Sequence, residues 1–270
     1  MIIKSKRKKE INMAIRTTAI LNLKGGVAKT TTAINMAAIL AHDHRKRVLL
    51  IDADSQCNVT EFFGGEPGDN MATILRDSKS YDSPDALAVL AIQHTDFEDL
   101  HLIPGDESLM DMDLSAASQG TVDTNILRGM IESETIRDYY DYVLIDCPPA
   151  FNAASAAALV AADDVVIPIK LDAFSLRGMA NLMRQIKNMR KLNPRLKLAG
   201  LLPTMWYDDP QITEAEQQLK DAELPVFHHI RRSDKVDSMT FQQEPLLISS
   251  PRSAAGVDYR KFVAEYMGGI

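Results

Sequence analysis

The sequence predicts an α/β fold in which a doubly wound, mostly parallel sheet carries helices on both of its faces. Apolar runs of strand length alternate with segments of helical periodicity through most of the 270 residues. The strand-length runs are apolar almost throughout, which is typical of strands buried on both faces of a parallel sheet. Ligands bind to doubly wound folds at the carboxyl ends of the strands, so a functional site is expected there.

The expected elements follow one another as strand and helix. The first apolar run predicts a strand at 17–23, and the periodic segment after it predicts a helix at 29–42. The segment 64–83 is polar and is therefore expected to be rich in loops. The other apolar runs predict strands at 47–52, 100–104, 142–146, 165–169 and 196–202. The other periodic segments predict helices at 152–162, 175–192, 210–222 and 254–267.

The composition is that of an ordinary globular protein, with 46% hydrophobic and 25% charged residues, and it excludes a disordered chain. Two cysteines, Cys57 and Cys147, are too few for a disulfide scaffold or a cysteine-rich metal site, and they fit a reducing cytosol. The longest apolar stretch, 153–162, is shorter than the about 20 residues that a membrane-spanning helix needs. Residues 1–16 are expected to form a basic disordered arm or an upstream extension, and 17–270 a single domain.

The charge is unevenly distributed along the chain, whose formal net charge is −7. Residues 1–164 carry 15 basic and 25 acidic side chains, a net charge of −10, whereas residues 165–270 carry 15 and 12, a net charge of +3. The segment 177–197 holds seven basic residues and no acidic one. A local basic face allows an acidic protein to bind a polyanion, although a charged run can equally be a solvated helix face.

A phosphate-binding loop follows the first expected strand. Glycines allow backbone N–H groups to turn toward phosphate oxygens, and the next helix directs its positive N-terminus at the same anion. The lysine of such a loop binds the β and γ phosphates, and the hydroxyl after it ligates Mg²⁺, which gives these roles to Lys29 and Thr30. The loop residues expected to bind the nucleotide are Lys24, Gly25, Gly26, Val27, Ala28, Lys29, Thr30 and Thr31.

Carboxylates end two of the expected strands at the edge of the sheet where the loop lies. Asp52 and Asp54 follow one apolar run, and Asp146 ends another. A cation that bridges two phosphates needs nearby carboxylates to orient its water ligands, and attack on the γ phosphate needs a group that positions water. Asp52 and Asp54 can divide these tasks, although an aspartate at the end of a strand can also simply cap the next turn.

Together these motifs resemble the ParA/MinD group of deviant Walker A P-loop ATPases, and specifically the ParA-type partition ATPases. The distinguishing feature is Lys24, an extra lysine at the start of the loop beside Lys29. Other segments are similar to the same family, namely LIPG at 102–105, DCPP at 146–149 and LNPRL at 192–196. The resemblance runs from about residue 17 to residue 267 and so covers nearly the whole chain.

The resemblance implies a homodimer that encloses two ATP molecules. Lys24 would reach the phosphates bound by the partner subunit, and Lys29 would bind those of its own subunit. Asp54 would position the attacking water, so these three residues are the implied catalytic ones. The implied Mg²⁺ ligands are Thr30 and, through water, Asp52 and Asp146.

The resemblance also implies that the ATP-bound dimer binds double-stranded DNA without sequence preference. It would hydrolyse ATP slowly, with stimulation by DNA and a ParB-like partner, and would partition a plasmid, a chromosome or an integrative element. Such a protein is cytoplasmic and nucleoid-associated, with no membrane attachment. Phosphate contacts to DNA carry no sequence information and weaken steeply with salt. The candidate DNA contacts are Arg232, Lys235, Arg260, Arg190 and Lys191.

Several residues depart from the family pattern. Ala28 stands where the family usually has glycine; alanine fits a negative φ, but a positive φ would cost roughly 1 kcal/mol or more. Ser55 and Cys57 replace the usual proline and glycine. The segment IRRS at 230–233 stands in place of a family Ile-Pro-Arg-Asn segment, whose proline and asparagine contact adenine. The candidate base contacts are therefore Arg231 and Ser233, and the preference for ATP over GTP rests on the resemblance.

Three other functions remain open on the sequence alone. A positioning ATPase of the MinD or McdA kind would move a protein cargo or a division component; MinD-like members need a C-terminal amphipathic membrane helix, for which the residues after 267 leave no room. An electron carrier like nitrogenase reductase needs cysteines that bridge a cluster between subunits, whereas Cys57 and Cys147 lie inside the nucleotide motifs. A metabolic enzyme would turn over a small phosphate acceptor without DNA or a partner.

Overall fold

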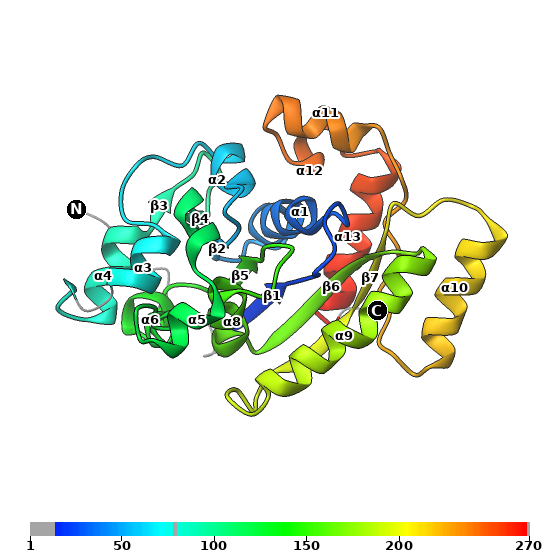
Figure 1. Ribbon diagram of the computed structural model, residues 1–270. Coiled ribbons are helices and arrows are strands. Elements are labelled where there is room, and N and C mark those ends of the chain that lie inside the picture. Colours follow the sequence, from blue (N-terminus) through cyan, green and yellow to red (C-terminus); the bar gives the residue numbers. More distant parts are fainter. Residues whose placement is uncertain (1–13, 78–79, 269–270) are drawn as a thin grey trace.

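The apolar runs of the sequence form one sheet at the centre of the molecule (Figure 1). The computed structural model describes residues 14–77 and 80–268, within which the sheet has seven strands in the order β3-β4-β2-β5-β1-β6-β7. Neighbouring strands are parallel, except that β3 pairs with β4 in the antiparallel direction. The strands are β1 (Arg16–Ile20), β2 (Val48–Asp52), β3 (Gln93–His94), β4 (Leu100–Ile103), β5 (Tyr142–Asp146), β6 (Asp164–Lys170) and β7 (Lys197–Thr204).

Helices cover both faces of this sheet, which confirms the doubly wound α/β architecture predicted from the sequence (Figure 1). On one face, α1 and α13 pack against strand residues such as Ile20 and Leu50. On the other face, α6, α8 and α9 pack against the alternate residues, such as Ala19 and Leu49. Because both faces of the central strands are buried, their sequences are continuously apolar. The helices are α1 (Lys29–His42), α2 (Asn58–Phe62), α3 (Met71–Asp77), α4 (Pro84–Ala91), α5 (Leu114–Ser118), α6 (Ile126–Ile131), α7 (Glu134–Arg137), α8 (Ala153–Ala161), α9 (Ala173–Met189), α10 (Pro210–Asp221), α11 (Lys235–Gln242), α12 (Leu246–Ser249) and α13 (Ala254–Tyr266), with a 3-10 helix, η2, at Glu107–Asp111.

The loop-rich prediction for 64–83 is wrong in the middle of that segment, where α3 lies. Asn70 begins this helix, since its side-chain carbonyl accepts the backbone N–H groups of Ala72 at 2.9 Å and Thr73 at 3.1 Å. Met71 and Ile74 are fully buried against the core. A seven-residue helix is too short to show a clear apolar period in a polar sequence, and its packing rather than its propensity stabilises it.

The folded domain begins before the predicted boundary at residue 17, because Arg16 is part of β1. Its guanidinium lies 2.7 Å from the Asp164 carboxylate and donates to the Tyr266 carbonyl at 2.9 Å. It also lies over the Tyr266 ring, 3.8 Å from the centroid. These contacts join β1 to β6 and to the end of α13. Most of the predicted basic arm, residues 1–13, lies outside the described residues.

The burial of His101 on β4 should make the stability of the fold depend on pH. It is buried, with Nδ1 2.6 Å from the Tyr140 hydroxyl oxygen. Burial, together with the neighbouring His94, lowers the pKa of His101 to about 4. The pKa of His101 is lower in the folded than in the unfolded chain. The free energy of unfolding is therefore greatest above pH ~6.5 and decreases as the pH falls toward 4.

We expect the free energy of unfolding to decrease by roughly 1–2 kcal/mol between pH 7 and pH 5 because of His101. Urea unfolding at the two pH values measures this difference. His101→Gln keeps a polar partner for Tyr140 but does not titrate, so its decrease should be smaller than that of the unchanged chain. Equal decreases in both proteins would contradict the assignment.

Candidate active site

A cavity of about 940 Å³ opens at the carboxyl edge of the sheet, where the sequence predicts the nucleotide site. The loop between β1 and α1 forms one wall, together with the segment after β2 that contains Asp54. The cavity is also lined by residues of the segment from Ile230 to Thr240, which leads into and includes most of α11, and by Tyr259 of α13. The volume falls within the range of ligand sites, about 300–1,000 Å³.

The loop has the backbone conformation that a phosphate cradle needs. Gly26 has φ +69°, a left-handed conformation that favours glycine. A β-carbon placed on Gly25 or Gly26 would meet no atom within 4 Å, so the space over both residues is open. Val27 instead anchors the loop: its side chain is buried, and its carbonyl accepts the Thr204 hydroxyl at 3.1 Å. Any contact that Val27 makes with a phosphate therefore comes from its backbone N–H.

Two positions where the family usually has glycine are left-handed in this chain. Ala28 has φ +65° and Cys57 has φ +53°. Ala28 is the residue before α1, and its carbonyl accepts the Thr32 N–H at 2.9 Å, so its conformation is fixed by the start of the helix. The positive φ that alanine does not favour is thus present, and Ala28 carries backbone strain.

Ala28→Gly should increase the free energy of unfolding by roughly 0.5–1 kcal/mol, because relief of the left-handed strain outweighs the extra entropy of glycine in the unfolded chain. Urea unfolding of the ligand-free protein measures the change. Ala33→Gly, in the interior of the same helix, is the matched control and should lower stability by about 1 kcal/mol or more. Destabilisation of similar size by both substitutions would show that Ala28 is unstrained.

The two lysines of the loop have different surroundings. Lys29 is 6% exposed, and its Nζ donates to the Lys24 carbonyl at 3.3 Å. Burial lowers the pKa of Lys29, while Asp146 and Asp54 act in the opposite direction. The Lys24 side chain is 37% exposed, and its Nζ lies 2.7 and 3.0 Å from the two carboxylate oxygens of Asp172. Lys29 thus lines the cavity, whereas the Lys24 side chain pairs with Asp172 and borders a separate hollow beside β6 and α9.

Asp146 and Asp52 lie side by side, because they are register partners at the ends of β5 and β2. Asp146 is fully buried, and its Oδ2 accepts the Thr30 hydroxyl at 2.7 Å. Asp52 Oδ2 accepts the backbone N–H of Thr60 at 2.9 Å and its hydroxyl at 2.7 Å. Burial raises the pKa of Asp52 to about 6, and burial together with the charge of Asp52 raises the pKa of Asp146 well above its usual range. Thr60 was not predicted, since nothing in its sequence context indicates that it would contact Asp52.

The Thr30, Asp52 and Asp146 oxygens fit a divalent cation. Asp146 Oδ1 is buried and has no hydrogen-bond partner among the described residues, which is an incomplete arrangement for a carboxylate unless a cation or its water completes it. Within 14–77 and 80–268, no cluster of three or more acidic, histidine or cysteine side chains forms a full metal cage. A site with few protein ligands suits Mg²⁺, because this ion keeps several water ligands and is also coordinated by the phosphates of the nucleotide.

Asp54 follows β2 and lines the cavity on the same side as Lys29. It is 6% exposed, and its Oδ1 accepts the backbone N–H of Gln56 at 3.1 Å. This bond caps the turn that follows β2, so Asp54 both caps the turn and lines the cavity.

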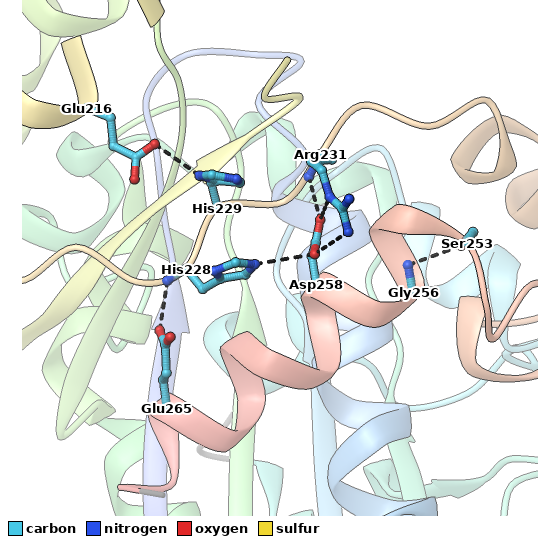
Figure 2. Close-up of polar contacts among 8 residues, drawn as sticks. All are labelled: Glu216, His228, His229, Arg231, Ser253, Gly256, Asp258 and Glu265. Carbon is cyan, nitrogen blue, oxygen red and sulfur yellow. Dashed lines mark hydrogen bonds and ion pairs between the residues drawn. The ribbon is translucent and has the colours of Figure 1, made fainter. Parts of the chain in front are cut away.

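The predicted base contacts, Arg231 and Ser233, line the same cavity as the loop. The backbone there extends the sheet: the Trp206 N–H donates to the Ile230 carbonyl at 3.0 Å. Arg231 is bound by Asp258 of α13, through Nε at 2.7 Å and Nη2 at 2.9 Å (Figure 2). Asp258 was not predicted, because no short-range pattern links α13 to a segment 27 residues earlier.

The five candidate DNA contacts do not form one cluster. Arg232 lines the cavity, and Lys235 begins α11 beside it, both exposed at the carboxyl edge. Arg260 lies 2.7 Å from Asp43 at the end of α1 and donates to the Pro251 carbonyl at 3.0 Å. Arg190 and Lys191 are exposed just after α9, where Arg190 Nε donates to the Leu196 carbonyl at 2.9 Å, at the opposite edge of the sheet from the loop.

Comparison with known proteins gives the family. Residues 15–198 match a family model described as AAA domain. The chromosome partitioning protein ParA of Caulobacter vibrioides is 35% identical over 259 residues, which cover 93% of each chain. The chain belongs to the ParA-type partition ATPases. The sporulation initiation inhibitor protein Soj of Bacillus subtilis is 31% identical over 92% of this ParA-family chain and 96% of its own.

Solved structures similar to this ParA-family chain include nucleotide complexes. Apo McdA of Cyanothece has a TM-score of 0.80 at 25% identity, covering 94% of this chain and 100% of that one. Cobyrinic acid a,c-diamide synthase of Mycobacterium smegmatis, with a bound ATP analog and magnesium, has a TM-score of 0.76 at 27% identity over 94% of both chains. These structures support a site for nucleotide and magnesium. Among the described residues of the ParA-family chain, none of the helices combines the length and apolarity needed to cross a bilayer.

Proposed function

We propose that this chain is an ATPase that dimerises on binding ATP, binds DNA without sequence preference and partitions a DNA molecule with a ParB-like partner. The observation that carries the proposal is the separation of the two loop lysines. Lys29 lines the cavity of its own subunit, whereas Lys24 pairs with Asp172 outside the lining of that cavity and is partly exposed. A loop lysine directed away from its own phosphate site is suited to contact phosphates held by a second subunit. The partition relatives support the same function.

The residues of one subunit account for binding of the nucleotide. Lys29 supplies a buried positive charge, and the 14-residue helix α1 has its positive N-terminus at the loop. Thr30 and Asp146 would hold Mg²⁺ with Asp52, and that ion would neutralise charge on the phosphates when bound. Asp54 accepts a hydrogen bond from the attacking water and orients it toward the γ phosphate.

Lys24 provides the nucleotide-dependent contact between subunits. Its ion pair with Asp172 is partly exposed at both ends and contributes less than about 1 kcal/mol. A triphosphate of the partner subunit offers more negative charge than one carboxylate, so Lys24 exchanges Asp172 for phosphate as the dimer closes. Hydrolysis and phosphate release remove that charge and open the dimer.

DNA binding is assigned first to Arg232 and Lys235. They lie at the same edge of the sheet as the nucleotide cavity, so closure of the dimer can align the two copies on one surface. Doubling the phosphate contacts multiplies affinity, which makes DNA binding a readout of bound ATP. Arg260, Arg190 and Lys191 would add contacts to longer DNA from positions farther from the cavity. Because it would bind DNA in this way, we expect the protein to lie in the cytoplasm at the nucleoid.

Charge reversal tests this assignment. Each phosphate contact contributes a salt slope of about 0.9, so Arg232→Glu with Lys235→Glu in both subunits should lower the slope by roughly 3–4 and weaken ATP-dependent duplex binding at least ~10-fold. Arg190→Glu with Lys191→Glu is the matched pair at the opposite edge and should have the smaller effect. Fluorescence anisotropy of a labelled random duplex measures both. A larger effect of the second pair would place the DNA on the α9 edge instead.

A positioning ATPase is the second candidate, and the similarity of fold to McdA favours it. It would share the ATP-dependent DNA binding and differ in its cargo. Hydrolysis measured with DNA alone, and then with a centromere-binding protein on its own site, separates the two. Stimulation only by the centromere complex would support partition, whereas its absence would favour a protein cargo.

A further inference from the structure

Arg231 is the most rigidly held arginine at the nucleotide cavity. Asp258 binds its guanidinium side-on through Nε and Nη2, and the same carboxylate accepts the Arg231 backbone N–H at 3.1 Å. The Asp258 side chain is fully buried, whereas the Arg231 side chain is 44% exposed and lines the cavity. The pair therefore consists of a buried anchor and an arginine whose outer part faces the cavity.

A second set of contacts holds the same segment on α13. The His228 ring nitrogen Nε2 lies 3.3 Å from Asp258 Oδ1, and the His228 backbone N–H donates to Glu265 at 2.7 Å. Figure 2 shows His228 and Arg231 approaching Asp258 from the same stretch of chain. Because Asp258 and Glu265 both lie on α13, the backbone that carries Arg231 is fixed as well as its side chain.

The position of Arg231 relative to the loop decides what it can contact. Lys29 and Thr30 of the phosphate loop line the same cavity as Arg231 and Ser233. A nucleotide whose phosphates occupy the loop has its base elsewhere in this cavity, within the part that Arg231 and Ser233 line. Arginine has five N–H donors, and Asp258 engages one on Nε and one on Nη2, which leaves three for the cavity.

We propose that Arg231, positioned by Asp258, selects the base, and that it makes the site accept guanine as well as adenine. The inference rests on the proposed nucleotide-binding function. Guanine presents two adjacent acceptors, O6 and N7, to a pair of arginine donors, whereas adenine presents one acceptor beside an amino group. Arginine pairs bidentately with guanine far more readily than with adenine, and such a pair is worth roughly 10-fold or more in discrimination.

Asp258 acts through Arg231 and is a positioning residue. Without the carboxylate, the guanidinium would have to be ordered when the base binds, and this lowers the gain from its hydrogen bonds. Loss of Asp258 should therefore shift base selection in the same direction as loss of Arg231, but less far. A residue needed only for folding would weaken ATP and GTP binding by the same factor.

Calorimetric binding of Mg-ATP and Mg-GTP to the full chain tests the proposal. The unchanged protein should bind GTP within about 10-fold of ATP; Arg231→Ala should weaken GTP binding about 10-fold or more and ATP binding less than about 3-fold. Asp258→Asn should give a smaller change of the same sign. Arg252→Ala, an exposed arginine just before α13, is the control and should leave both affinities unchanged.

The outcomes separate the inference from the function on which it rests. ATP binding with GTP excluded, or an equal loss of both nucleotides in Arg231→Ala, would overturn base selection by Arg231 and leave the ATPase proposal intact. Binding of neither nucleotide by the unchanged protein would overturn both. Loss of Arg231 leaves the buried Asp258 carboxylate without its main charge partner, so urea unfolding must first show that Arg231→Ala is folded. Arg231→Lys keeps a positive charge beside Asp258 but lacks the planar pair of donors, and it should show the same selective loss of GTP binding.

Discussion

Replacing Lys29 with alanine should weaken Mg-ATP binding at least ~100-fold, because a buried charge-assisted contact to phosphate is lost. Lys29 is 6% exposed and its charge interacts with those of Asp146 and Asp54, whose negative charges would otherwise repel the phosphates. Without the Lys29 ammonium, the phosphates lose an attractive charge, and the negative charges of the two aspartates repel them more strongly. Isothermal titration with ATP measures the affinity.

The matched variant for this test is Lys24→Ala in the same loop. Since Lys24 contacts Asp172 outside the lining of the cavity, its loss should leave the ATP affinity of the monomer within about 3-fold, given the small energies of exposed ion pairs. The ATP-dependent dimer should nevertheless disappear in light scattering. Equal loss of ATP affinity in the two variants would contradict the separate roles of the lysines.

Asp54→Ala should reduce ATP hydrolysis by ~100-fold or more, because a group that orients the attacking water contributes on the order of 10²–10⁴ to the rate. Asp54 hydrogen-bonds to the Gln56 backbone and supplies a negative charge near Lys29 rather than a phosphate contact, so nucleotide binding should persist. The variant should then accumulate as the ATP-bound dimer and stay on DNA. Single-turnover phosphate release and gel filtration with ATP measure the two effects.

Asp54→Asn tests whether hydrolysis depends on the charge of the Asp54 side chain or only on its shape. The amide keeps the size of the side chain and can still accept a hydrogen bond, but it is a far weaker base. Hydrolysis near the normal rate in either variant would remove Asp54 from its assigned role. Loss of ATP binding in both would instead show that Asp54 supports the loop.

The sequence predicted those parts of the structure that local pattern determines. The helix at 29–42 and the strand at 142–146 were predicted to the residue, because a buried parallel strand and a long helix both leave strong patterns. The proximity of Asp52 and Asp146 also followed, since the ends of parallel strands share one edge. The edge of the sheet at which the cavity lies was therefore predictable from the sequence.

Contacts between distant segments could not be predicted in this way. The Asp258 anchor of Arg231, the Thr60 bonds to Asp52 and the Lys24 pair with Asp172 join residues that no short-range pattern connects. The sign of φ at Ala28 was also open, because alanine adopts either conformation when the surrounding chain requires it. Tertiary structure settles all four.

The central claim is that bound ATP switches DNA binding, and one measurement tests it directly. Binding of a random-sequence duplex is followed by anisotropy with Mg-ATP, Mg-ADP and no nucleotide, over a salt series that starts at low salt. We predict binding only with ATP, with a steep dependence on salt. Absence of binding with ATP at low salt while the dimer still forms, or equal binding in all three states, would contradict the claim.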